Sequence, residues 1–122
     1  MIAQDVGRAL NPALCEGQMR GGVAQGIGWA LFEELSVDTD GQVVNGSFVG
    51  YLVPGAPELP PIETLLHELP APDGPFGAKG IGEACVVGAP AAVANAIAAA
   101  TGARMQELPM TPERVLAALQ GM

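Results

Sequence analysis

Residues 11–35, NPALCEGQMRGGVAQGIGWALFEEL, decide the fold of this chain. Asn11 suits a helix N-cap and Pro12 suits the first turn, so the pattern predicts a helix from Pro12 to about Leu35. Apolar residues recur along this stretch at the spacing of a helix face, at Leu14, Met19, Val23, Ile27, Ala30 and Leu31.

Glycines interrupt this predicted helix at positions 17, 21, 22, 26 and 28. Each costs up to about 1 kcal/mol relative to alanine in an exposed helix. A helix that keeps so many glycines is therefore expected to pack very closely against another helix or a ligand. For Gly21 and Gly22 we expect helix packing rather than direct contact with a ligand.

The elements around this helix predict an α+β fold, with a few strands and two C-terminal helices. Strands are expected at Met1–Val6, on either side of a turn at Asp38–Gly41, at Ser47–Val53 and at Ile62–Leu69. Irregular loops are expected at 54–61 and 70–82, and helices from Pro90 to about Ala100, ended by Gly102, and from Pro112 to about Leu119.

Composition limits what the chain can do. Its 122 residues carry a net charge of −8, and the basic residues are scattered, which argues against nucleic-acid binding. Cys15 and Cys85 do not form a disulfide framework or a zinc motif, so we expect reduced thiols in a cytoplasmic protein. We also expect no signal peptide and no membrane span, the Ala-rich stretch after Pro90 being the nearest to one.

The second informative stretch is residues 77–83, GAKGIGE. Lys79 is the only lysine of the chain, and Glu83 is the only carboxylate between Asp73 and Glu107. The glycines allow tight bends or the close approach of another group. This pattern indicates a site built around the Glu83 carboxylate. The alternative is a plain helix-start glutamate, stabilised there by the helix dipole.

These two stretches belong to a longer series of motifs. The series runs through residues 5–12 (DVGRALNP), 16–28 (EGQMRGGVAQGIG), 30–34 (ALFEE), 46–48 with Tyr51 and Pro54, 74–83 (GPFGAKGIGE), 89–91 (APA) and 108–113 (LPMTPE). In order and spacing it resembles the C-terminal portion of the molybdopterin-binding large subunit of the xanthine dehydrogenase and aldehyde oxidase family of molybdenum hydroxylases.

The resemblance implies roles for individual residues. Glu83 would be the catalytic general base beside the molybdenum, and the apolar residues after it would raise its pKa by desolvation. Gln18 would hydrogen-bond the pterin, since an amide offers both donor and acceptor, and Gln25, two turns on, would support it. The cofactor-binding wall would be Lys79, Gly80, Ile81 and Gly82. The Lys79 side chain would pair with a carboxylate or hold the loop, and the alternative is a plain surface lysine.

The resemblance also implies a cofactor, partners and a reaction. The cofactor would be a molybdenum–pterin, either molybdopterin or its cytosine dinucleotide form, with the metal held by the pterin and not by protein ligands. FAD and iron–sulfur clusters would lie on partner subunits or domains. The reaction would hydroxylate an sp² carbon of an N-heterocycle or aldehyde.

The domain expectation is a single partial domain over residues 1–122, with a catalytic loop at 74–84. The chain would be a fragment or a small subunit that completes the remainder of the large subunit, and inactive alone. Two other hypotheses are a non-catalytic interaction or assembly module and an inactive remnant. The sole histidine, His67, is expected to have no catalytic role.

Overall fold

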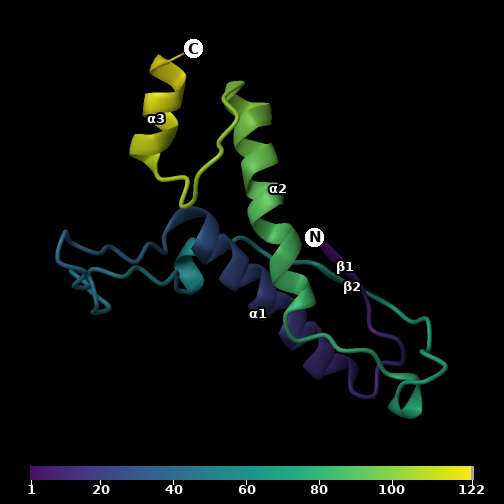
Figure 1. The fold of residues 1–122 in the computed structure, drawn as a ribbon. Helices are drawn as coiled ribbons and strands as arrows, with labels where there is room; N and C mark the ends of the chain where they lie inside the picture. The colour runs from purple at the N-terminus through teal and green to yellow at the C-terminus, as the bar shows by residue number, and fades with distance from the viewer. Residues whose placement is uncertain (122) are drawn as a thin grey trace.

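The computed structural model describes residues 1–121 and confirms the α+β class. In chain order its elements are β1 (Ile2–Asp5), α1 (Pro12–Leu31), a 3-10 turn (Ala56–Glu58), β2 (Thr64–His67), a second 3-10 turn (Pro75–Gly77), α2 (Ala84–Thr101) and α3 (Pro112–Gln120). Figure 1 shows α1 and α2 packed against each other, with both strands at one end of the pair and α3 at the other.

Close packing of the glycine-rich helix is confirmed, and its partner is α2. A Cβ atom placed on Gly22 would lie 2.7 Å from Cys85 Cβ, and one on Gly26 would lie 2.6 Å from Ala89 Cβ. Only glycine lets the two helices approach this closely. Gly21 has no such neighbour among residues 1–121: it is exposed, and nothing lies within 4 Å of its Cβ position.

Both long helices differ from the prediction at one end. The N-terminus of α1 is as expected, since the Asn11 side chain accepts a hydrogen bond from Leu14 N at 3.2 Å. The helix ends at Leu31 instead of Leu35 because the N–H groups of Phe32 and Glu33 both turn back to Gly28 O. Helix α2 begins at Ala84 rather than Pro90, and Pro90 lies inside it.

The tolerance of Pro90 has a local reason. A proline cannot donate to the carbonyl one turn earlier, which here belongs to Val86. Gly26 of α1 fits against this place: a Cβ on Gly26 would lie 2.9 Å from Val86 O and 3.2 Å from Pro90 Cδ. The packing of α1 thus covers the region where α2 loses a hydrogen bond.

The sheet has two parallel strands, with Ile2 opposite Thr64 and Asp5 opposite His67. Pairing continues beyond the strands, because Gly7 forms an antiparallel bridge with Ala78. The strand predicted at Ser47–Val53 is wrong. Its residues form turns, in which the N–H groups of Gly50 and Tyr51 both donate to Ser47 O.

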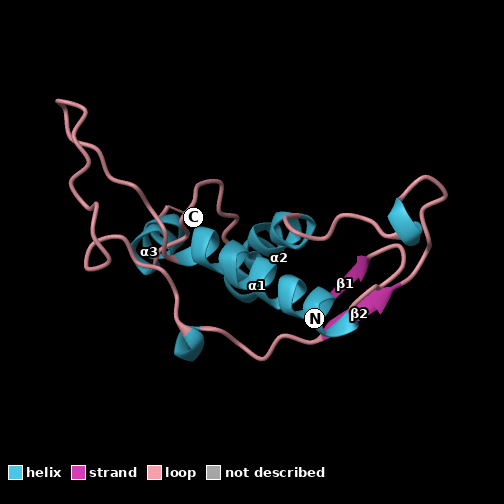
Figure 2. Ribbon diagram, turned by 90° about the horizontal axis from the view of Figure 1, so that it is seen from below, coloured by secondary structure: helices cyan, strands magenta, loops and turns pink. Residues whose placement is uncertain are grey.

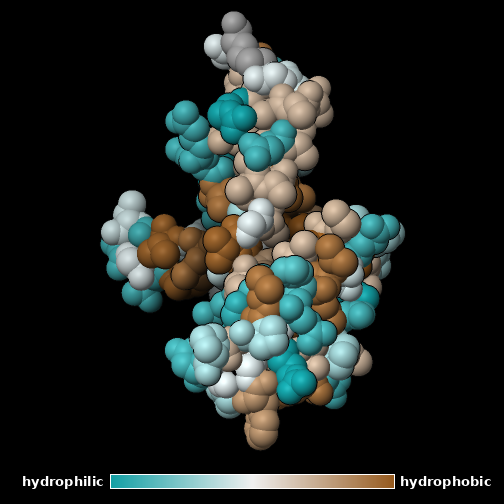
Figure 3. All heavy atoms as spheres, turned by 90° about the vertical axis from the view of Figure 1, so that its right-hand side faces the viewer, coloured by the Kyte–Doolittle hydropathy of each residue, from teal (hydrophilic) through white to brown (hydrophobic). Residues whose placement is uncertain are grey.

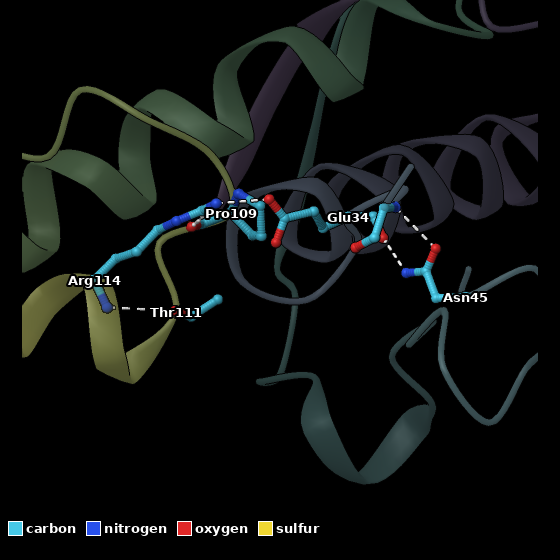
Figure 4. Close-up of polar contacts among 6 residues, drawn as sticks. Glu34, Asn45, Pro109, Thr111 and Arg114 are labelled. Atoms are coloured by element: carbon cyan, nitrogen blue, oxygen red, sulfur yellow. Dashed lines mark hydrogen bonds and ion pairs between the residues drawn. The ribbon is translucent and has the colours of Figure 1, made fainter. Parts of the chain in front are cut away.

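Residues 36–53 form an excursion away from the helix pair (Figures 1 and 2). At its base Val37 and Val43 form an isolated antiparallel bridge across the expected turn. Asn45 fastens the base to the end of α1, since its side chain accepts from Ser36 N at 2.8 Å and donates to Glu34 O at 2.6 Å (Figure 4).

Helix α3 is attached to the end of α1 by polar contacts. The Arg114 guanidinium donates to Pro109 O at 2.7 Å and to Glu34 Oε1 at 2.6 Å (Figure 4). Met110 N donates to Ala30 O at 2.6 Å, and the Thr111 hydroxyl accepts from Arg114 N at the start of the helix. This part of the chain therefore lies far from the sheet end of the molecule.

The core is small for the length of the chain. Its buried side chains are Val6, Met19, Ile27, Ala30, Cys85, Val86, Ala103 and Met110. Many large apolar residues stay exposed, including Phe48 and Phe76, and Figure 3 shows apolar side chains at the surface in the middle of one face. Helix α2 is long and apolar enough to cross a membrane by length and composition alone, but α1 packs along one side of it.

Candidate active site

The loop that carries Glu83 is fastened to the end of β1 by backbone hydrogen bonds. Gly77 O accepts from Arg8 N at 2.8 Å and from Ala71 N at 2.9 Å, and Lys79 N donates to Val6 O at 3.0 Å. Gly7 has a left-handed backbone (φ +67), and a Cβ there would lie 2.4 Å from Gly77 O. The site therefore requires glycine at position 7.

A side-chain ion pair adds to this attachment. The Lys79 ammonium donates to Asp5 Oδ2 at the end of β1, and Asp5 Oδ1 accepts from Gly7 N at 2.9 Å and Leu69 N at 3.3 Å. The hydrogen bond from Lys79, followed by that from Gly7, lowers the pKa of Asp5 to about 2. The Lys79 side chain is thus engaged within the chain, which is the alternative role expected for it.

Gln18, Lys79 and Ile81 meet at one shallow pocket of about 190 Å³. The pocket lies between the N-terminal part of α1 and the loop, and Arg8 and Cys15 also line it. Gln18 is exposed, and its amide makes no hydrogen bond within residues 1–121. Since ligand sites usually occupy roughly 300–1,000 Å³, this pocket is the size of part of a site.

Arg8 is a pocket residue that the sequence analysis did not single out. Its guanidinium forms no ion pair within the described chain, whereas Lys79 is paired with Asp5. The signal available in the sequence was its place beside Gly7 in the DVGRALNP motif. Nothing in its spacing relates it to Gln18, because the two come together only through the fold.

The backbone of Gly80, Ile81 and Gly82 is open to an incoming group. Their N–H groups find no backbone acceptor among residues 1–121, and Cβ atoms on Gly80 and Gly82 would meet nothing within 4 Å. Successive free N–H groups are suited to binding anionic or carbonyl oxygens. Gly80 and Gly82 themselves do not line the pocket around Gln18.

Glu83 is the N-cap residue of α2, as the helix-start alternative required, but its side chain makes no capping hydrogen bond. The carboxylate is exposed, and it forms no ion pair within the part of the chain that is described. Directly after it, Cys85 and Val86 are buried against α1. The carboxylate is thus rigidly connected to the helix pair and free to interact with a group outside the chain.

The chain is similar to known proteins over almost its whole length. Residues 1–60 match the family model of a molybdopterin cofactor-binding domain. The chain is 44% identical over 121 residues to the 6-hydroxypseudooxynicotine dehydrogenase complex subunit gamma of Paenarthrobacter nicotinovorans, covering 97% of this chain and 15% of that protein. It is 43% identical over 112 residues to the putative xanthine dehydrogenase molybdenum-binding subunit of Escherichia coli K12, covering 91% and 15%.

A solved structure is similar over the same extent. The chain superimposes on quinoline 2-oxidoreductase from Pseudomonas putida 86 with a TM-score of 0.90 and 40% identity, covering 97% of this chain and 15% of that one. The chain belongs to the xanthine dehydrogenase and aldehyde oxidase family of molybdenum hydroxylases. It spans about 15% of the length of these molybdenum hydroxylase subunits.

The hydrogen-bonding groups of this site are compatible with the cofactor of a molybdenum hydroxylase. A pterin edge needs both donors and acceptors, which the free Gln18 amide and the open backbone of residues 80–82 supply. Residues 1–121 contain no cluster of three His, Cys, Asp or Glu side chains able to hold a metal ion. A metal carried by its own organic ligand is compatible with this set of side chains.

Of the remaining reactive groups, His67 and Cys85 do not line the pocket around Gln18. His67 is exposed on β2. Cys85 is buried, and desolvation raises the pKa of its thiol. Cys15 and Cys85 are both free thiols, and of the two only Cys15 lines the pocket around Gln18.

Proposed function

We propose that this chain forms one wall of the molybdenum–pterin site of a molybdenum hydroxylase and supplies its general base, Glu83. The observation that carries the proposal is the free carboxylate at the start of α2, next to an open glycine backbone and fixed to the helix pair by buried neighbours. The wall is the catalytic loop 74–84 together with the exposed face of α1.

In this proposal each residue has one task. Gln18 hydrogen-bonds the pterin through its side-chain amide, and the backbone N–H groups of Gly80, Ile81 and Gly82 contact cofactor oxygens. Lys79 contributes its backbone to the wall while its ammonium stays with Asp5. The cofactor, as molybdopterin or its cytosine dinucleotide form, would supply the oxygen nucleophile and would take up the hydrogen of the attacked carbon together with the two electrons of the oxidation.

Glu83 handles the proton. One oxygen of its carboxylate accepts a proton from the nucleophile as the nucleophile attacks an sp² carbon of an N-heterocycle or aldehyde. A base must lie within hydrogen-bond reach of that proton in a site from which water is excluded. Exclusion of water requires more chain than these residues, because Glu83 is exposed here.

The partners follow from the same reasoning. The remainder of a molybdopterin-binding large subunit would close the site, and iron–sulfur and FAD subunits or domains would carry electrons away. We propose a single partial domain, inactive alone, in a cytoplasmic enzyme with reduced Cys15 and Cys85. A purely structural interaction module is the competing function, and it predicts no dependence of turnover on Glu83.

Glu83→Gln in the assembled enzyme tests the proposal. Glutamine keeps the shape but cannot accept the proton, so turnover per molybdenum should fall by about a hundred-fold or more. Molybdenum content should stay near the wild-type value, because no metal ligand is lost. The matched control is Glu107→Gln, an exposed glutamate beyond α2. Wild-type turnover in Glu83→Gln would sink the general-base assignment.

A further inference from the structure

The segment between Lys79 and Cys85 has firm attachments at its two ends only. At the far end Cys85 is buried, with its Cβ against Gly22 of α1. At the near end Lys79 N donates to Val6 O, and the Lys79 ammonium pairs with Asp5. Between them Gly80 and Gly82 have no neighbours at their Cβ positions.

Two glycines in such a short span make it conformationally permissive. No backbone hydrogen bond within residues 1–121 involves the N–H groups of residues 80–82. Glu83 itself is held by α2, because Val86 N donates to Glu83 O at 3.0 Å and Cys85 is buried. The position of residues 79–82 relative to Glu83 and to the pocket around Gln18 therefore depends on where the near end is held.

Asp5 is the residue that holds the near end of this segment in place. Its Oδ1 accepts from Gly7 N and Leu69 N, which belong to the turn after β1 and the end of β2. Its Oδ2 receives the only lysine of the chain. One carboxylate thus joins both strand ends to the loop. The Asp5 pKa of about 2 keeps this carboxylate charged throughout the neutral range.

We propose that Asp5 is the positioning residue of the catalytic loop: acting through Lys79, it sets the place of residues 79–82, the proposed cofactor wall, relative to Glu83 and Gln18. This inference rests on the proposed function of Glu83, but the attachment of the loop is testable without turnover. A misplacement of about 1 Å at a reacting group can cost about a hundred-fold in rate. Asp5 itself touches neither substrate nor cofactor in this proposal.

The experiment uses the cofactor-loaded holoenzyme with four variants: Asp5→Asn, Lys79→Met, the double variant and Lys79→Arg. Asparagine keeps an acceptor for Gly7 N and Leu69 N while removing the charge that holds Lys79. The matched control is Glu34→Gln, which breaks the comparably exposed pair with Arg114 at the other end of the molecule. Turnover and KM are measured per molybdenum, and hydrogen exchange is followed in a peptide covering residues 79–84.

Asp5→Asn and Lys79→Met should each lower kcat per molybdenum by about ten- to a hundred-fold with KM changed little. The double variant should be no worse than the more impaired single variant, because both remove the same interaction. Lys79→Arg should recover most of the activity. Exchange in residues 79–84 should accelerate in Asp5→Asn and Lys79→Met, and it should not change in Glu34→Gln.

Unchanged exchange and unchanged kcat per molybdenum in Asp5→Asn would overturn the proposal. So would a loss confined to the unfolding temperature or molybdenum content, since that is what a merely structural residue would give. If Asp5→Asn fails to fold, Lys79→Met carries the same decision. Turnover retained by Glu83→Gln would refute the base assignment alone, while hydrogen exchange would still decide whether Asp5 holds the loop.

Discussion

The two faces of α1 both carry glycine, but their surroundings are very different. The inner face, with Met19, Gly22, Gly26 and Ala30, is buried, and its glycines meet α2 at distances that exclude a side chain. The outer face carries Leu14, Gln18, Gly21 and Gln25, all exposed. The inner face is covered by α2 of this chain, whereas the outer face is exposed and can contact a group outside the chain.

Within this one helix, the residues of the inner face serve folding, whereas those of the outer face are available for function. A glycine whose Cβ position is occupied by a neighbour is required for the fold of this chain. A glycine whose Cβ position is empty is not required for the packing of this chain. The exposed leucine on the same face is not required for that packing either. The outer face is continuous with the pocket around Gln18, so the proposed cofactor wall gives it a use.

The largest effect expected from this contrast concerns Gly26→Ala. The added Cβ would lie 2.6 Å from Ala89 Cβ and 2.9 Å from Val86 O, so α1 and α2 must separate. Overpacking of this kind costs about 1–3 kcal/mol, more than the gain from replacing a helical glycine. Denaturant unfolding of the enzyme that contains the chain should show the loss.

Gly21→Ala is its matched control in the same helix. With nothing within 4 Å of its Cβ position, it should leave α1–α2 packing intact and add up to about 1 kcal/mol of helix stability. If the added methyl group disturbs a contact on the outer face, the loss should appear instead as reduced molybdenum content or reduced assembly. Equal destabilisation by the two substitutions would contradict the division into inner and outer faces.

A smaller effect is expected for Gln18→Leu, which removes a free amide from the pocket. Loss of one or two hydrogen bonds to the pterin, each worth about 1 kcal/mol, should weaken cofactor retention by roughly ten-fold. Molybdenum and pterin content after dialysis measure this. Gln25→Leu is the control, because Gln25 lies on the same face but outside the pocket, where the structure gives it no contact within residues 1–121 that would support Gln18. Equal losses in both variants would place the cofactor contact elsewhere.

The smallest effect is a pH dependence of the Asp5–Lys79 pair. The pKa of Asp5 is lowered from 3.8 to about 2, so the folded state binds this proton more weakly than the unfolded state. Its stabilisation is complete above pH ~4 and is lost as the pH falls through 2. The difference in unfolding midpoint between wild type and Lys79→Met should be constant above pH ~4, shrink towards 2 and vanish well below it. A difference that stays constant from neutral pH to well below 2 would show that the ion pair is not its cause.

Local signals predicted the elements that depend on neighbouring residues. The Asn11-Pro12 start of α1 and the Thr111-Pro112 start of α3 are capping patterns, and both helices begin there. The helix interpretation was wrong at Pro90 because a proline normally marks a helix start, while here packing against Gly26 supports α2 through it. The sequence also suggested a strand at Ser47–Val53, but within residues 1–121 no strand pairs with it.

For the candidate site, sequence singled out Gln18 and the Lys79 to Glu83 loop from the motif series. It could not predict that Asp5 holds Lys79 or that Arg8 joins the pocket. Asp5 and Lys79 are 74 positions apart along the chain, and the pocket likewise brings Arg8 to the distant Lys79. These contacts depend on the parallel pairing of β1 with β2, for which the sequence has no local turn signal.

The central claim is that the open side of this chain is one wall of a molybdenum–pterin site. The most direct test is to purify the native protein that contains the chain under gentle conditions and measure molybdenum per chain with the accompanying polypeptide. We expect molybdenum in roughly stoichiometric amount, together with the rest of a molybdopterin-binding large subunit. A folded protein free of molybdenum and pterin, from cells that make the cofactor, would contradict the claim.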